Sequence, residues 1–193
     1  IEYLKNEGYP PLKIRGKRLQ GGEVYVSGSV SSQFISALMM VAPTMENGLI
    51  INIRDEIISK PYISLTAKLM EEYGIHLKWV GNRIKIKPQS YKPVSFKVES
   101  DWSAASYWYE MVALCPDAEI TLLGLKENSY QGDANLISLF KDLGVSTEFV
   151  SNGVVIRKAG KPIKKFFHNF IYEPDLAQTF AATCCFLHVP FIF

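Results

Sequence analysis

An internal repeat constrains the fold of this 193-residue chain more than any other feature of its sequence. Three similar corners begin at Ser29, Asp101 and Asp175, about 70 residues apart. Each follows a strand-like run and precedes a helix-like run rich in alanine, serine and aromatic residues. The later parts of the units also match, because 69–75 resembles 139–145 and 82–86 resembles 152–156. The repeat therefore predicts α/β units that bury their cores by packing together.

The first unit is predicted to have the element order β-α-β-α-β-β. Strand-like runs cover 24–26 and 49–53, and a hairpin turns at Gly81 and Asn82. A first helix should start near residue 34 and stop before Pro43, and a second should run from about Pro61 to Gly74. Helical spacing predicts that the buried faces are Phe34, Ala37, Leu38 and Val41 in the first helix, and Tyr62, Leu65, Thr66, Leu69 and Tyr73 in the second.

The second unit repeats this order and the third is incomplete. Strands are expected at 94–98 and 119–123, helices after Asp101 and Asp133, and a hairpin around 151–153. The third unit offers a strand at 170–172 and a helix after Asp175. The expected fold class is α/β, with about two and a half units. Since the chain opens without methionine and stops inside a unit, we expect a fragment of a longer protein.

Composition excludes several classes of protein. Hydrophobic residues make up 48% and charged residues 21%, which is typical of a globular protein. A net charge of +2 is too small to suggest a nucleic-acid partner. No apolar run is long enough to span a membrane, and no signal peptide is visible. Cys115, Cys184 and Cys185 lack metal spacing and are expected to be free thiols in a reducing cytoplasm.

Small polar residues gather where the predicted helices begin. Ser31, Ser32 and Gln33 precede the first helix, and Ser59 precedes the second. A serine there can simply cap the helix, which contributes about 1 kcal/mol. It can also donate to an anion held at the free N–H groups of the helix terminus. Asp175 leaves a similar choice between a helix cap and a functional carboxylate, and the residues alone do not decide.

Four segments, taken together and in order, resemble the 5-enolpyruvylshikimate-3-phosphate (EPSP) synthase family. They are Gly28 to Phe34, Ile58 to Ile63, Asp101 to Tyr107 and Asn128 to Asp133. The resemblance implies two domains, each an inside-out α/β barrel made of three β-α-β-α-β-β units. Residues 1–98 would be the later part of the first domain, and residues 99–193 the beginning of the second.

The resemblance also implies a reaction. The family transfers the enolpyruvyl group of phosphoenolpyruvate to the 5-hydroxyl of shikimate 3-phosphate, in aromatic amino-acid biosynthesis. The enzyme would be a monomeric transferase that needs no metal or redox cofactor. It would have no nucleic-acid or membrane partner. Because the family's catalytic lysine, arginine and glutamate positions fall outside residues 1–193, we expect this chain alone to be inactive.

Site residues follow from the matched motifs. Ser31, Ser32 and Ser59 are expected to bind the 3-phosphate, and Gln33 to lie between shikimate 3-phosphate and phosphoenolpyruvate. Tyr62 would face the shikimate ring. Asp175 lies in a further segment, Pro174-Asp175-Leu176, which resembles the family's Pro-Asp-Ala with leucine in place of the usual alanine. It would bind ring hydroxyls and act as the catalytic base, since a carboxylate beside a hydroxyl can accept its proton. Lys60 is expected to be solvated and Asp101 to be structural.

Two alternatives remain open. The first is an enzyme like UDP-N-acetylglucosamine enolpyruvyl transferase, which the resemblance implies would share the repeat and the donor but use a reactive loop cysteine. None of the three cysteines falls in such a predicted loop. The second alternative is a non-catalytic binding module on the same fold.

Overall fold

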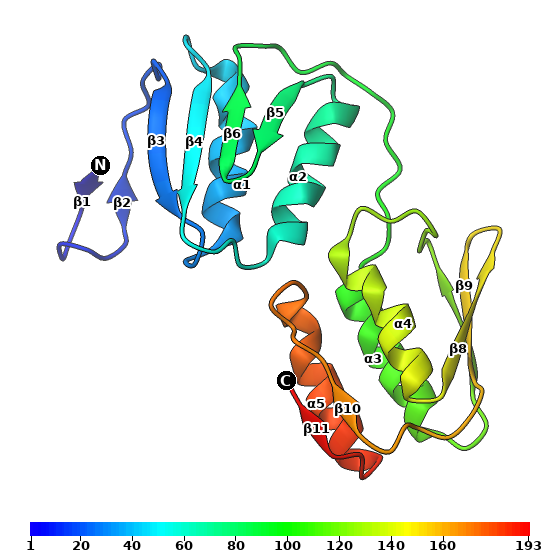
Figure 1. Cartoon of the computed structure of the whole chain (residues 1–193). Coiled ribbons are helices and arrows are strands. Elements are labelled where there is room, and N and C mark those ends of the chain that lie inside the picture. The colour runs from blue at the N-terminus through cyan, green and yellow to red at the C-terminus, as the bar shows by residue number, and fades with distance from the viewer.

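The computed structural model describes residues 1–193, which form two α/β halves joined by an extended segment (Figure 1). The α/β class is confirmed, and so is the strand and helix order of the first unit. The fifteen residues from 87 to 101 that connect the halves contain no helix or strand. Residues 59–62 of the first half contact residues 132, 133 and 171 of the second.

The first half is a four-stranded sheet covered on one face by two helices. Its strands are β3 (Gly22–Ser27), β4 (Leu49–Arg54), β5 (Leu77–Val80) and β6 (Arg83–Ile86), in the order β3-β4-β6-β5. β3 pairs parallel with β4, whereas β6 pairs antiparallel with both β4 and β5. The helices are α1 (Ser32–Val41) and α2 (Lys60–Glu72), and a short 3-10 turn, η1 (Ala42–Thr44), follows α1 at Pro43.

The second half has a three-stranded antiparallel sheet and three helices. Its strands are β7 (Glu119–Leu123), β8 (Val145–Val150) and β9 (Gly153–Lys158), in the order β7-β9-β8. The helices are α3 (Trp102–Leu114), α4 (Leu136–Asp142) and α5 (Ala177–Phe186), with 3-10 turns η2 (Gly132–Asn135) and η3 (Pro174–Leu176). Two short strands, β10 (Phe166–Phe167) and β11 (Phe191–Ile192), pair in parallel beside α5.

Each half has its own hydrophobic core. A cluster of 14 buried residues lies within 35–86, and a cluster of 18 lies within 102–189. Phe140 and Phe180 pack at the centre of the second core, with ring centroids 4.4 Å apart. No residue belongs to both clusters, so the contact between the halves depends on other groups.

Both helix faces predicted from periodicity are wrong. In α1 the buried residues are Ile35 and Met39, whereas Phe34 is 64% exposed and Val41 is 44% exposed. In α2 the core face is Ile63, Ala67 and Met70. The predicted stripe of α2, which begins at Tyr62, instead turns toward the second half of the chain.

Two predicted strands are also wrong. Residues 94–98 are extended but have no ladder partner, because β7 pairs only with β9, and Val98 is 80% exposed. Residues 170–172 form a turn in which the Ile171 N–H donates to the Asn169 side chain at 3.1 Å. The Ile171 carbonyl then accepts from the first half instead of from a neighbouring strand.

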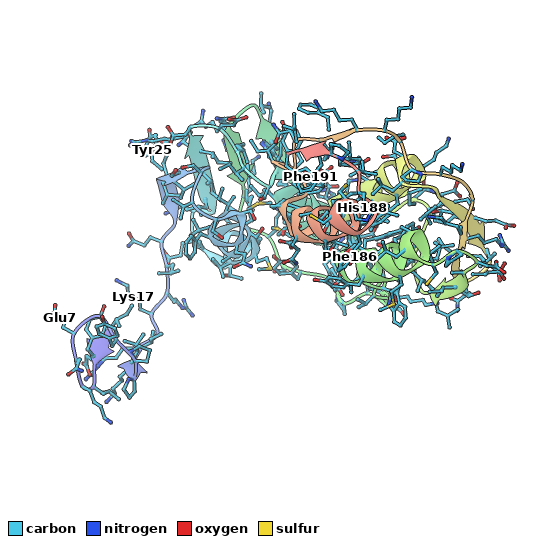
Figure 2. The ribbon with its side chains drawn as sticks, turned by 90° about the horizontal axis from the view of Figure 1, so that it is seen from below. Glu7, Lys17, Tyr25, Phe186, His188 and Phe191 are labelled. Carbon is cyan, nitrogen blue, oxygen red and sulfur yellow. The ribbon has the colours of Figure 1, made fainter.

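The N-terminal residues form an arm that stands away from both cores. β1 (Glu2–Tyr3) and β2 (Leu12–Lys13) pair antiparallel, and every residue from 1 to 20 is exposed. Figure 2 shows Glu7 and Lys17 on this arm, apart from the two halves. The helices are all too short or too polar to cross a membrane.

Candidate substrate-binding pocket

A pocket of about 500 Å³ lies where the two halves meet, and all six predicted site residues line it. Three segments far apart in sequence form its wall: the start of α1, the first half of α2, and η3. The lining residues are Val30, Ser31, Ser32, Gln33, Ser36, Met40, Ser59, Tyr62, Leu65, Thr66, Pro174 and Asp175. The structure therefore brings together predicted site residues that are up to 144 positions apart, from Ser31 to Asp175.

Ser31 and Ser32 contribute differently at the start of α1. Ser31 is the N-cap, and its Oγ accepts from the Gln33 backbone N–H at 3.3 Å, so the capping interpretation of Ser31 is confirmed. Ser32 is the first helical residue and does not occupy the cap position. Ser32 lines the pocket, and its hydroxyl can donate to a ligand there.

Ser59 begins α2 without capping it through its side chain. Its backbone is left-handed, with φ 58° and ψ 35°, and its Oγ makes no capping hydrogen bond. The Ser59 backbone N–H donates to the Ile171 carbonyl at 3.0 Å, which fixes the residue against the second half. The capping interpretation of Ser59 is therefore wrong, and the hydroxyl is free for a ligand.

Tyr62 joins the pocket to a buried carboxylate in the second half. Its hydroxyl donates to both oxygens of Asp133, at 3.2 and 3.3 Å, and the Ser103 hydroxyl donates to Oδ2 of the same carboxylate. Burial, with added repulsion from the charges of Asp133 and Asp175, raises the pKa of Tyr62 far above its ordinary value. Tyr62 is therefore a neutral phenol throughout the physiological range.

Asp133 is the functional candidate that sequence reasoning missed. It is 2% exposed, and burial raises its pKa, with further repulsion from Asp175 and Glu173. Hydrogen bonds from Ser103 and Tyr62 oppose that shift. The motif Gln131-Gly132-Asp133 was visible in the sequence, but nothing in it signals that Asp133 reaches helix α2.

Asp175 lies on η3, at the edge of the pocket and open to solvent. The N-cap position of α5 is occupied by Leu176, so Asp175 does not cap that helix. Its charge contributes to the raised pKa of both Tyr62 and Asp133, which places it beside this pair. The pocket thus combines serine hydroxyls with the carboxylate of Asp175, while the Asp133 carboxylate lies outside the lining and contacts Tyr62.

The remaining polar candidates take structural roles. Asp101 caps α3, since its carboxylate accepts from the backbone N–H groups of Ser103 and Ala104 at 2.8 and 3.2 Å. Lys60 is exposed, and its ammonium lies 5.5 Å from the centroid of the Trp79 ring. Cys184 is buried in α5, whereas Cys115 and Cys185 are exposed, and all three are free thiols.

None of the twelve lining residues is a lysine or arginine. A phosphate in this pocket would receive hydroxyl and backbone donors but no cationic partner from its wall. Strong binding of a dianion normally needs such charge-assisted bonds. The pocket wall therefore lacks the charge-assisted donors that tight binding of a dianion would need.

Fold and pocket together define a protein of repeated α/β units with a pocket lined by serine, threonine and tyrosine hydroxyl groups. The chain belongs to the EPSP synthase family (3-phosphoshikimate 1-carboxyvinyltransferase), whose pattern it matches over residues 1–192.

Curated relatives support this assignment. The chain is 48% identical over 194 residues to a 3-phosphoshikimate 1-carboxyvinyltransferase of Bacteroides fragilis, covering 100% of this chain and 47% of that protein. It is 38% identical over 189 residues to the enzyme of the same name from Vibrio atlanticus, covering 96% of this chain and 44% of that protein. The chain thus spans about half the length of the curated relatives it matches.

Solved structures show the same fold. Two structures of EPSP synthase from Acinetobacter baumannii match with TM-scores of 0.64 and 0.67, each at 19% sequence identity. They cover 92% and 94% of this chain and 41% of each matched chain. At this identity the likeness supports the α/β fold alone.

Proposed function

We propose that this chain supplies the shikimate 3-phosphate wall of an enolpyruvyl transferase. In that reaction the enolpyruvyl group of phosphoenolpyruvate moves to the 5-hydroxyl of shikimate 3-phosphate, and phosphate is released. The observation that carries the proposal is the convergence of all six motif residues on one pocket. The alternative of a nucleotide-sugar acceptor is less well supported, because the pocket contains none of the three cysteines.

Each residue has a proposed role. Ser31, Ser32 and Ser59 donate hydrogen bonds to the 3-phosphate, since their hydroxyls line the pocket near the N-termini of α1 and α2. Gln33 lies between this substrate and phosphoenolpyruvate. Asp175 binds ring hydroxyls and accepts the proton of the reacting 5-hydroxyl.

The division into domains is also a proposal. Residues 1–98 would belong to the first of two inside-out barrels, and residues 99–193 would begin the second. The separate cores within 35–86 and 102–189 support this boundary. The barrels would close only with further units, because the sheets here are open and have four and three strands.

The complete enzyme would be a cytoplasmic monomer without a metal or redox cofactor. The free thiols of Cys115, Cys184 and Cys185 support a reducing compartment. A net charge of +2 supports the absence of a nucleic-acid partner. This chain alone would not turn over, because its pocket wall carries no cationic group for either anionic substrate.

An NMR and calorimetric titration of shikimate 3-phosphate into the 193-residue chain tests the half-site. We expect the backbone amides of Ser31, Ser32 and Gln33 to shift at millimolar ligand. Ser32→Ala should weaken the response with little effect on folding, because Ser32 is not the cap. UDP-N-acetylglucosamine serves as the comparison ligand. A stronger response to it, or none to shikimate 3-phosphate, would remove the proposed assignment.

A further inference from the structure

We infer that Asp133 is a positioning residue that fixes the direction of the Tyr62 hydroxyl, so that Tyr62 accepts a hydrogen bond from a ligand hydroxyl and does not bind its phosphate. This inference rests on the proposed function. It adds a residue that does not line the pocket and an orientation for the ligand within it.

The geometry places Asp133 directly behind Tyr62. Tyr62 lines the pocket, whereas Asp133 does not and is 2% exposed. The phenol proton points at the carboxylate, because the Tyr62 oxygen lies 3.2 Å from Oδ1 and 3.3 Å from Oδ2. Ser103 holds Oδ2 from the other side, which fixes the carboxylate in turn.

The numbers of hydrogen-bond donors and acceptors then determine how Tyr62 can interact with a ligand. A carboxylate only accepts, whereas a phenol has one proton and can accept through its oxygen. With its proton committed to Asp133, Tyr62 presents an acceptor to the pocket. A phosphate oxygen also only accepts, so it gains nothing at this position, while a ring hydroxyl can donate to it.

Charge reinforces the same orientation. Asp133 and Asp175 both lie next to Tyr62, and the pocket wall has no cation to offset them. A dianionic phosphate is repelled by these carboxylates, and the donors available to it are the hydroxyls of Ser31, Ser32 and Ser59. The ring hydroxyls of the ligand then face Tyr62 and Asp175.

An alternative role for Asp133 is purely structural: its hydrogen bond with Tyr62 would hold the two halves together. The structure offers a way to separate this role from orientation of the Tyr62 hydroxyl. Other contacts also join the halves near this point. The Ser59 N–H donates to the Ile171 carbonyl, and Gly132 packs against Pro61. A loss of the tie would disturb the whole pocket, whereas a loss of orientation should affect only ligands that carry hydroxyl groups.

The test compares shikimate 3-phosphate with inorganic phosphate, each titrated by NMR into the 193-residue chain. We expect Asp133→Asn and Tyr62→Phe each to weaken shikimate 3-phosphate binding roughly tenfold, as for loss of one hydrogen bond between neutral groups. Binding of inorganic phosphate at the Ser31 and Ser32 amides should change less than twofold. The double variant should be no weaker than either single variant, because both changes remove one interaction.

Tyr130→Phe is the matched control, since it removes another tyrosine–carboxylate hydrogen bond between the halves, from Tyr130 to Glu72, and leaves Tyr62 bonded to Asp133. We expect it to change shikimate 3-phosphate affinity less than twofold. Equal losses of affinity for both ligands, or additive effects in the double variant, would overturn the inference and leave Asp133 with a structural role only.

If Asp133→Asn does not fold, Tyr62→Phe tests the inference alone, by whether it weakens binding of shikimate 3-phosphate more than binding of inorganic phosphate. If the unaltered chain binds no shikimate 3-phosphate, the proposed function fails and this inference fails with it. If the unaltered chain binds shikimate 3-phosphate and both variants bind it with the same affinity, only this inference fails.

Discussion

Ser59 stands at the start of α2 with a left-handed backbone, and its side chain makes no capping hydrogen bond to the helix. A non-glycine residue with φ 58° is held there at a cost of about 1 kcal/mol, and the surrounding contacts must impose it. The hydrogen bond to Ile171 is one such contact. A strained serine with a free hydroxyl in a pocket is the arrangement expected of a ligand-binding residue.

We therefore predict that Ser59→Ala and Ser59→Gly separate binding from stability. Both remove the hydroxyl and should weaken shikimate 3-phosphate binding about tenfold. Ser59→Ala should leave thermal stability within about 0.5 kcal/mol, because no cap is lost. Ser59→Gly should stabilise the chain by up to about 1 kcal/mol, because glycine accepts positive φ freely. Destabilisation of about 1 kcal/mol by Ser59→Ala would show that the hydroxyl caps α2 after all.

Asp133 gives the chain a pH dependence whose sign follows from its raised pKa. The group is buried against Tyr62 and Ser103, with the charges of Asp175 and Glu173 nearby. Its folded pKa lies above its unfolded one, so the folded state binds the proton more tightly. Its contribution to stability is therefore greatest below the ordinary aspartate pKa of about 4, and declines as pH rises through the raised folded value.

Thermal unfolding of the unaltered chain and Asp133→Asn between pH 4 and 7 checks this sign. We expect the difference in stability to move in favour of the asparagine variant as pH rises, because that variant has no buried charge to form. Asp117→Asn, at an exposed aspartate after α3, is the control for the general effect of removing a carboxylate. Parallel curves for the unaltered chain and Asp133→Asn would contradict the shift.

Between elements, the two halves pack tightly where η2 meets the first turn of α2. A Cβ added at Gly132 would lie 2.4 Å from the Pro61 Cβ, and the rigid proline ring cannot move aside alone. We predict that Gly132→Ala destabilises the chain by about 1–3 kcal/mol and weakens shikimate 3-phosphate binding, by pushing η2 from α2. Gly160→Ala is the control, because a Cβ there meets nothing within 4 Å. Equal thermal stabilities for the two variants would mean that η2 can move away from α2 without a loss of stability.

At the same scale, element order was predictable and helix orientation was not. Turn residues such as Gly81, Asn82 and Gly144 mark the ends of elements directly in the sequence. Helix α1, however, is apolar on several sides, so one spacing template fits both the buried Ile35 and the exposed Phe34. Periodicity finds an apolar stripe but does not say which of two stripes faces the sheet.

The sequence motifs predicted individual residues that line the pocket, but not the pocket itself. Ser31, Ser59 and Asp175 come from separate segments, and only the fold places them together. Asp133 was not predictable, since its importance comes from a hydrogen bond across 71 positions of sequence. A contact between a pocket residue and a residue behind it leaves no pattern in the local sequence.

For the whole molecule, the separation of the two cores determines how the chain should unfold. No buried residue of the first core belongs to the second, and no partly buried apolar side chain that packs against one core packs against the other. The contacts between the halves are largely polar, such as Tyr62 with Asp133 and Tyr130 with Glu72 at 2.7 Å. Polar contacts of this kind couple two cores only weakly, because each is worth about 1 kcal/mol.

We therefore predict that the two halves lose stability independently. Ile84→Ala, in the centre of the first core, should destabilise that half by about 2–5 kcal/mol. Native-state hydrogen exchange should then show faster exchange for amides of β4 and β6 and little change for β8 and β9. Ile156→Ala, at a fully buried position of the second core, is the matched variant and should show the reverse. Equal acceleration in both sheets would mean that the polar interface makes the chain a single cooperative unit. In that case the pocket between the halves would be as rigid as the cores themselves.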